Sequence, residues 1–471
     1  MALDKTFWRP ARGGIVISAI GLGSIGFFFL FVIFYRGCSL YADDREFQIV
    51  LTGQDLGSLE PCGCSSGQWG GLSRRHTLLR SIQSSNIPTM ILSTGDLSDQ
   101  PDRLGEIKFQ TQIQSMNLMG YHAVGLGEKD LMLGVDFIQS LIPLMKFRLI
   151  ASNITQPAGE TVFDAVFVLN LNHFRIHVLN ILSGEYRSLA ELQDLKWVSP
   201  QEVLARELKS FPKKESWIVI FHGSLDEARI LVENFPKINI MIVSHDVEEP
   251  KEGVLNEGET QIVFVPRRGK HVLLLKEKID AGGRPRLLSY GALPLDEKVS
   301  HSEEVDDIFR DYQNILGQER LDQEVARRTV QNVSYVGSSA CRVCHTNAYE
   351  KWSQSRHAEA FKTLDNLKRA YDPDCLICHS TGFRYQNGFR GEKETSHLAL
   401  VGCESCHGPG ENHVKEPLKN ILRKVTPEKC IECHDSENSP QFDYVKYWPR
   451  ITHGKDSGYS AVHPSKSSEE F

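Results

Sequence analysis

The sequence predicts a chain of three parts: an N-terminal membrane helix, an α/β layered domain, and a mainly helical, loop-rich C-terminal domain. Three observations predict this fold class. Residues 15–35 are uncharged, residues 47–293 alternate short apolar runs with helical patterns, and eight of the 11 cysteines follow residue 335. The 471 residues are enough for two or three domains.

The apolar stretch IVISAIGLGSIGFFFLFVIFY, residues 15–35, is predicted to be a transmembrane anchor. Its 21 residues are enough to cross the hydrocarbon core of a bilayer as a helix. The residues before it include three cations, Lys5, Arg9 and Arg12. This excess of positive charge predicts that residues 1–14 are cytoplasmic and that the rest of the chain lies outside the cytoplasm.

Two alternatives to an anchor remain open. A cleaved secretory signal is one, although the stretch is longer than a usual signal and no clear cleavage site follows it. Lipidation of Cys38 is the other, although FYRGC lacks the small or aliphatic residues expected before such a cysteine. Because all three interpretations involve export, the predicted location is the outer, periplasmic side of a bacterial cytoplasmic membrane.

Residues 47–293 are predicted to form the α/β layered domain. The expected strands are short, rich in Val and Ile, and end in Gly, Asn or Asp: FQIVLTG, TMILSTG, HAVGLG, RLIASN, VFVLN, RIHVLNIL, WIVIFHG and IMIVSHD. Helices are expected between them, for example at residues 72–83 and 200–210. Alternating strands and helices indicate layers around a sheet, with functional groups on loops after the strand ends.

Residues 302–330 are predicted to contain a helix that links the α/β domain to the C-terminal domain. Apolar side chains recur there at helical spacing, at Val305, Ile308, Phe309, Tyr312, Ile315 and Leu316.

Residues 335–471 contain the motif Cys-x-x-Cys-His four times, as Cys341, Cys344 and His345; Cys375, Cys378 and His379; Cys403, Cys406 and His407; and Cys430, Cys433 and His434. A zinc ribbon does not need His directly after the second Cys, and a disulfide does not need His at all. A covalent c-type haem uses all three positions: both thiols bind the vinyl groups, and the His binds the iron. The sequence therefore predicts four haems with these four histidines as proximal ligands.

Five other histidines in this domain are candidates for the opposite side of an iron: His357, His397, His413, His453 and His463. A second histidine makes the iron low-spin and suited to electron transfer, whereas a vacant site lets a small molecule bind. The alternative for each is an ordinary surface histidine. His463 lies in a Ser-rich tail and is not assigned as a ligand.

This region resembles the multihaem cytochrome c-554 family. The stretches that carry the resemblance are ACRVCHTNAYEKWSQSRHAEAF, GCESCHGPGENHVKEP and YWPRITHG. The resemblance implies closely packed haems, with His357, His413 and His453 as distal ligands, and often one iron without a firm sixth ligand. His397 is the candidate for the remaining site.

The α/β domain resembles the calcineurin-like metallophosphoesterases, particularly 5'-nucleotidases and thiosulfohydrolases. The segments DLGSLEP, GGLSRRHTLLR, STGDLSD, GLGEKD, ASNI, FHG and VSHD occur in the family's order. The family's Asp-x-His is reduced to Asp55, and its Gly-Asn-His-Glu reads Gly125, Leu126, Gly127 and Glu128. The expected Asn ligand and catalytic His are therefore missing.

At most four family ligands remain, at Asp55, Asp96, His222 and His245, and Val247 stands where a further His is expected. Because two-metal catalysis needs both ions, we expect at most one divalent metal and little hydrolase activity. The alternative is that these four are ordinary polar residues of the core and strand ends.

Cys62 and Cys64 form a Cys-x-Cys pair within EPCGCSSGQWGG, after the first predicted strand. Two neighbouring thiols in an exported protein are candidates for a redox couple, a soft-metal site or a strained disulfide. The alternative is a structural pair in a tight turn.

The predicted function is that of a membrane-anchored, exported tetrahaem cytochrome that transfers electrons. Its expected partners are redox proteins or quinol-linked membrane donors, and a net charge of −7 gives no reason to expect nucleic acid. One alternative is a haem oxidoreductase converting a small nitrogen or sulfur compound at an open iron. Another is a phosphate or sulfur ester hydrolase with an attached cytochrome. Whether the protein is an enzyme, and its oligomeric state, are left open.

Overall fold

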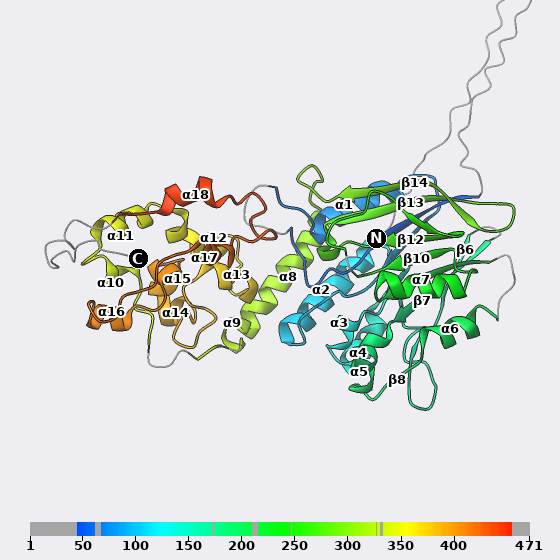
Figure 1. The fold of residues 1–471 in the computed structure, drawn as a ribbon, viewed down its shortest axis with the longest axis horizontal. Coiled ribbons are helices and arrows are strands. Elements are labelled where there is room, and N and C mark those ends of the chain that lie inside the picture. The colour runs from blue at the N-terminus through cyan, green and yellow to red at the C-terminus, as the bar shows by residue number, and fades with distance from the viewer. Residues whose placement is uncertain are drawn as a thin grey trace, which may run out of the picture. The chain divides into compact units, whose positions relative to one another are not determined.

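The computed structural model describes residues 45–61, 67–171, 174–209, 215–245, 247–325, 327–329 and 333–454. In this part, all strands lie between Glu46 and Pro294, and only helices follow them (Figure 1). Several residues of the sequence analysis lie outside the described residues: the predicted anchor at residues 15–35, Cys38, Cys62, Cys64 and His463. Among the described helices, none combines the length and apolar character needed to cross a membrane.

Six strands form the first sheet: β1 (Glu46–Thr52), β2 (Thr89–Ser93), β3 (Ala123–Gly125), β4 (Arg148–Ile150), β13 (His271–Ile279) and β14 (Pro285–Pro294). Their order is β14-β13-β1-β2-β3-β4. Strands β1 to β4 run parallel, and β13 is antiparallel to both β1 and β14. In the β1–β2 register, Val50 lies opposite Ile91.

Six further strands form the second sheet: β6 (Phe167–Leu171), β7 (Phe174–Leu182), β9 (Ser216–His222), β10 (Ile240–Val243), β11 (Leu255–Glu257) and β12 (Thr260–Phe264). Their order is β11-β12-β10-β9-β7-β6, with the four central strands parallel. Strands β5 (Ile154–Thr155) and β8 (Lys196–Trp197) form a separate pair. All eight predicted strands are confirmed, whereas β5, β8 and β11 to β14 were not predicted.

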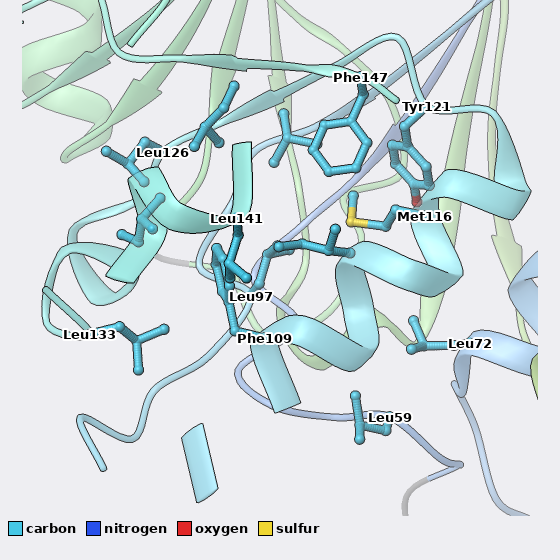
Figure 2. Close-up of a cluster of buried hydrophobic side chains, with 14 of the residues drawn as sticks. Leu59, Leu72, Leu97, Phe109, Met116, Tyr121, Leu126, Leu133, Leu141 and Phe147 are labelled. Carbon is cyan, nitrogen blue, oxygen red and sulfur yellow. The ribbon is translucent and has the colours of Figure 1, made fainter. Parts of the chain in front are cut away.

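The two sheets pack face to face, and helices cover their outer faces. Alternate side chains of one strand point to opposite faces of its sheet, so Ile49 and Leu51 of β1 enter the core between the sheets while Val50 points outward. The outer face of the first sheet is covered by α1 (Leu72–Gln83) and α2 (Arg103–Met119), whose buried cluster is drawn in Figure 2. Helices α6 (Pro200–Glu207) and α7 (Leu225–Asn234) cover the second sheet. The predicted α/β layers are therefore confirmed.

The helix boundaries follow from local chemistry. The Asp102 side chain accepts a hydrogen bond from the backbone N–H of Gly105 at the start of α2, and Gly120 ends that helix with a left-handed φ of 73°. Such caps satisfy backbone groups that have no partner within the helix. In α7, Ser224 and Glu227 form a reciprocal capping box. The remaining short helices of this domain are α3 (Glu128–Leu131), α4 (Val135–Leu141), α5 (Arg187–Glu191), η1 (Ile142–Leu144), η2 (Gly184–Tyr186) and η3 (Arg267–Gly269).

The predicted linking segment forms α8 (Glu303–Glu319) and α9 (Leu321–Glu324), separated at Arg320, which has a left-handed φ of 53°. The apolar face of α8 is buried in the same cluster as α1 and α2, through Val305, Tyr312 and Leu316. The helical periodicity read from the sequence therefore marks a packed face, and the linking helix is part of the α/β domain's outer layer.

The C-terminal region consists of short helices: α10 (Ser338–Cys341), α11 (Thr346–Ser353), η4 (Arg356–Glu359), α12 (Ala360–Asn366), α13 (Pro373–His379), α14 (Glu392–Thr395), η5 (Ser396–Leu398), α15 (Cys403–His407), α16 (Glu411–Lys415), α17 (Pro427–Ile431) and α18 (Tyr444–Ile451). Its buried apolar cluster is small, comprising Tyr335, Phe361, Leu364, Leu376, Phe383, Phe389 and Leu398. The prediction of a mainly helical, loop-rich region is confirmed.

Candidate functional site

Each Cys-x-x-Cys-His motif forms or ends a helical turn. The third motif is the whole of α15, and the second lies at the end of α13. In the first and fourth motifs, the backbone N–H of the His donates to the carbonyl of the first Cys, at 2.9 Å in each. Residues three and four apart share one face of a helix, so both sulfurs and the imidazole point the same way. The eight motif cysteines are thiols rather than disulfides, as covalent haem attachment requires.

Three pairs of histidine rings face each other in the C-terminal region. The ring centroids are 6.1 Å apart for His345 and His413, 6.0 Å for His357 and His434, and 6.0 Å for His407 and His453. Imidazoles bound to opposite sides of one metal, with bonds of about 2 Å, have centroids roughly 6 Å apart. Each pair joins one proximal ligand to one predicted distal ligand, so the residues fit three six-coordinate haem irons.

Hydrogen bonds hold several of these rings in the orientation that iron binding needs. The Nδ1–H of His413 donates to the carbonyl of Asn420 at 2.9 Å, and that of His407 donates to the carbonyl of Arg423 at 3.1 Å. A carbonyl oxygen only accepts hydrogen bonds, so these contacts fix the proton on Nδ1 and leave the Nε2 lone pair for a metal.

The ionisation of the paired histidines also suits metal binding. Burial lowers the pKa of His357, His407 and His434. Because a neutral imidazole binds a metal and an imidazolium does not, burial keeps these rings in the binding form.

The other two described histidines of this region, His379 and His397, do not belong to the three pairs. His379 of the second motif donates from Nδ1 to the carbonyl of Ala360 at 2.7 Å, which again directs Nε2 away from the backbone. His397 is exposed and its ring lies against Gly337. It takes no part in the three pairs, and its assignment to the second haem stays a prediction.

The α/β domain brings together Asp96, Glu128, His222 and His245. Asp96 follows β2, Glu128 begins α3, His222 ends β9, and His245 follows β10. One ligand atom from each of the four lies within 4.8 Å of the others. This is the edge where parallel strands end, and where functional groups of α/β folds gather. The predicted candidates Asp96, His222 and His245 are therefore brought into one buried group.

The charges in this group are coupled. The pKa of Asp96 is raised to about 7, first by burial and then by the neighbouring Glu128 carboxylate. For Glu128, burial favours the neutral form, but hydrogen bonds from His222 and His245 outweigh it and lower the pKa. Two buried carboxylates side by side are costly without a cation, and the arrangement suits a divalent metal.

Asp130 positions the Asp96 segment and takes no part in the group. Its carboxylate accepts hydrogen bonds from the backbone N–H groups of Asp96 at 2.8 Å and Leu97 at 2.7 Å. These bonds hold Asp96 in a left-handed conformation with φ of 51°, which a non-glycine residue adopts only when its surroundings enforce it.

Asp55, predicted as a candidate ligand, lies outside this group. Both of its carboxylate oxygens accept hydrogen bonds from the guanidinium of Arg75, at 2.9 and 2.5 Å. The two side chains are 0% and 1% exposed, so the pair is closed to solvent. In this structure a buried arginine neutralises Asp55, and its role as a metal ligand stays a prediction.

Glu128 is a candidate ligand that the sequence analysis did not include. The sequence contained a signal for it, because Glu128 stands at the Glu of the family's Gly-Asn-His-Glu motif. The missing Asn and His of that motif drew attention away from the retained Glu. The structure brings its carboxylate to the two histidines, at 3.2 Å from each.

Comparisons with known proteins find relatives of both domains. Residues 340–408 match the family described as cytochrome c554 and c-prime. The chain is 30% identical over 156 residues to cytochrome c-554 from Nitrosomonas europaea, which covers 25% of this chain and 66% of that protein. The C-terminal region therefore resembles the cytochrome c-554 family.

Solved structures show a matching fold for the α/β domain. The sulfate thiohydrolase SoxB from Thermus thermophilus matches with a TM-score of 0.50 and 14% identity, over 58% of this chain and 61% of that one. A putative 5'-nucleotidase from Staphylococcus aureus matches with a TM-score of 0.50 and 16% identity, over 68% and 66%. The domain has the calcineurin-like phosphoesterase fold, and identities this low speak for the fold alone.

Proposed function

We propose that this protein is an exported, membrane-anchored tetrahaem c-type cytochrome that transfers electrons between quinol-linked membrane donors and soluble redox proteins. The observation that carries the proposal is the set of three histidine pairs, with ring centroids 6.0–6.1 Å apart. An iron with two histidine ligands has no free position for a substrate, and it changes oxidation state with little change of geometry. Such haems pass electrons on and do not bind a reactant.

A fourth haem is supported by the remaining Cys-x-x-Cys-His motif, at Cys375, Cys378 and His379, which has no histidine pair among the three described. The haem itself supplies the redox chemistry, and the chain supplies thiols, axial imidazoles and their orientation. Export is supported by the uncharged stretch at residues 15–35, which is long enough for an anchor.

The phosphoesterase-like domain is proposed to serve as a docking or redox module and to lack hydrolase activity. In a two-metal phosphoesterase, both ions clamp the attacking and leaving oxygens. Here Asp55 is held by Arg75, and Leu126 and Gly127 stand at the positions of the expected Asn ligand and catalytic His.

The test is a combined mass and spectroscopic measurement on the purified full chain. Mass spectrometry is expected to find four haems that survive acid extraction. Electron paramagnetic resonance of the oxidised protein is expected to show low-spin signals from at least three haems. A colourless protein loaded with zinc at the motifs would contradict haem attachment, and wholly high-spin iron would contradict the histidine pairs.

The proposed location is tested separately. Protease added to spheroplasts of an expressing bacterium is expected to digest the haem domain, and the chain is expected to stay in the membrane fraction. A protected haem domain would contradict the topology without affecting the haem assignment.

A further inference from the structure

We propose that Asp96, Glu128, His222 and His245 form a closed, four-ligand Zn²⁺ site that holds a single ion and has a structural role. We infer further that Arg75 supplies the positive charge beside Asp55 that a second ion would otherwise provide. The proposal concerns the α/β domain alone and does not depend on the proposed electron transfer.

The four ligand atoms all lie within 4.8 Å of one another, close enough to surround one ion. From Glu128 Oε2, the distances are 3.2 Å to His222 Nδ1 and 3.2 Å to His245 Nε2. From Asp96 Oδ2, the distances to the same nitrogens are 3.7 and 3.8 Å. Four ligands around a zinc ion, with bonds of about 2.0–2.1 Å, are separated by about 3.3–3.4 Å. The separations from Glu128 are close to this value, and those from Asp96 are longer by a few tenths of an ångström.

Three of the four ligands direct one atom inward and hold their other polar atom in place. His222 donates from Nε2–H to the carbonyl of Thr94 at 2.6 Å, which leaves Nδ1 for the ion. Asp96 Oδ1 accepts from the backbone N–H of Lys129 at 3.0 Å, and Glu128 Oε1 pairs with Lys129 Nζ at 3.0 Å. Partners of this kind orient metal ligands from behind.

Hydrogen bonding among neutral groups does not explain the inward-facing atoms. A neutral imidazole has one N–H, and His222 uses it on Thr94, so its Nδ1 donates to Glu128 Oε2, 3.2 Å away, only when the ring is an imidazolium. In the neutral ring, Nδ1 presents a lone pair that a metal can bind. Asp96 Oδ2 is also buried and has no hydrogen-bond partner within the described structure. A cation between these atoms satisfies all of them.

The position of a second ion is filled by Arg75. The guanidinium binds both oxygens of Asp55, and a Cβ placed on Gly269 would lie only 2.4 Å from Asp55 Oδ1 and 2.2 Å from Arg75 Nη2. This packing leaves no space for an ion at Asp55. Because the Arg75 guanidinium occupies the place of a second ion, the domain holds a single metal ion.

The ligand set selects the ion and its role. Two imidazole nitrogens with two carboxylates suit Zn²⁺, whereas Mg²⁺ and Ca²⁺ prefer oxygen alone. Catalytic zinc keeps one position open for water, and structural zinc is closed by four protein ligands. With all four positions taken by side chains, the ion ties together the segments after β2, β9 and β10 and the start of α3.

The first experiment measures metal content in the purified full-length protein with its haems in place. After chelation and reconstitution with ZnCl₂, elemental analysis is expected to find one zinc for every four haem irons. X-ray absorption at the zinc edge is expected to show four nitrogen or oxygen ligands at about 2.0 Å. Less than a fifth of an equivalent, two zinc ions per chain, or five or six ligands would overturn the proposal.

The second experiment uses matched variants. Glu128→Gln keeps the side-chain shape and removes the charge, and zinc affinity is expected to fall at least tenfold. The control is Glu277→Gln, a buried glutamate of β13 that contacts Gln261, whose zinc affinity is expected to be unchanged. If Glu128→Gln does not fold by circular dichroism, His245→Gln replaces it, because His245 is the most exposed of the four ligands at 17%. Unaltered zinc binding in the folded ligand variant would overturn the proposal.

A structural role of the zinc ion predicts an effect on the unfolding temperature that a purely catalytic role does not. Removal of the ion by a chelator is expected to lower the unfolding temperature of wild type by several degrees and to leave that of Glu128→Gln unchanged. Equal unfolding temperatures of wild type with and without the ion would contradict the structural role.

Discussion

The rings of His345 and His413 stack with their centroids 6.1 Å apart and their planes inclined by 23°. His413 is only six residues from His407 of the third motif, yet it faces the His of the first motif. His407 itself faces His453. Each of the three pairs therefore joins distant segments, so axial ligation depends on the folding of the whole region.

Replacing His413 with Ala is expected to convert one haem from low-spin to high-spin iron, because the first haem loses its distal ligand. Electron paramagnetic resonance of the oxidised protein would show one low-spin signal fewer and one high-spin signal more. All four haems are expected to stay attached, because the thioether bonds do not involve His413.

The matched control is His397→Ala, which removes an exposed histidine outside the three pairs. It is expected to leave the three low-spin signals intact. Loss of any of the three paired signals in the control, or an unchanged spectrum in His413→Ala, would contradict the pairing.

Glu404, inside the third motif, is expected to stabilise the haem region by joining two of its segments. It is 3% exposed and accepts hydrogen bonds from the backbone N–H groups of Val336, Gly337 and Gly410, at 2.7–3.1 Å. Glu404→Gln replaces one carboxylate oxygen with an NH₂ group, which cannot accept these hydrogen bonds, and removes the negative charge. The free energy of unfolding is therefore expected to fall by about 2 kcal/mol.

Urea unfolding followed by haem absorbance measures this effect. Glu432→Gln is the control, because Glu432 also lies inside a Cys-x-x-Cys-His motif but its ion pair with Lys429 is on an exposed surface. Equal unfolding midpoints for the two variants would show that the Glu404 contacts contribute little.

Gly127→His, which restores the His of the phosphoesterase motif, is expected to damage the domain without creating a hydrolase. A Cβ at Gly127 would lie 2.0 Å from Asp96 Oδ1, so the new side chain would displace a proposed ligand. Metal-dependent hydrolysis of a nucleotide is expected to stay at background in wild type and variant, and zinc content is expected to fall in the variant. Turnover by wild type would contradict the loss of hydrolase activity.

Cys62 and Cys64, which lie outside the described residues, are still predicted to form a redox or metal-binding pair. A disulfide across one residue is strained and easily reduced, and its small loop stabilises the fold little. Replacing both with Ser is expected to leave haem content unchanged. Thiol trapping of wild type is expected to find two interconvertible states or one metal-protected state. Thiols that stay inert under all conditions would indicate that the pair has only a structural role.

Local patterns could be interpreted from the sequence, because neighbouring residues decide them. The spacing of Cys341, Cys344 and His345 places all three on one helical face, whatever the rest of the chain does. The eight predicted strands depended on apolar runs bounded by turn residues, and α1 (Leu72–Gln83) has the predicted bounds.

Long-range packing decided what the local pattern left open. The sequence showed five further histidines, and only the fold placed the ring of His413 beside that of His345 and the ring of His357 beside that of His434. Likewise, Asp55 matched a metal-ligand motif until the fold placed Arg75 against it, and Glu128 became a candidate ligand when β9 and β10 brought two histidines to it. The sequence by itself determined which residues can bind a haem or a metal, because that depends on side-chain chemistry. The tertiary structure decided which of them meet, because a shared site needs atoms from distant segments within a few ångströms.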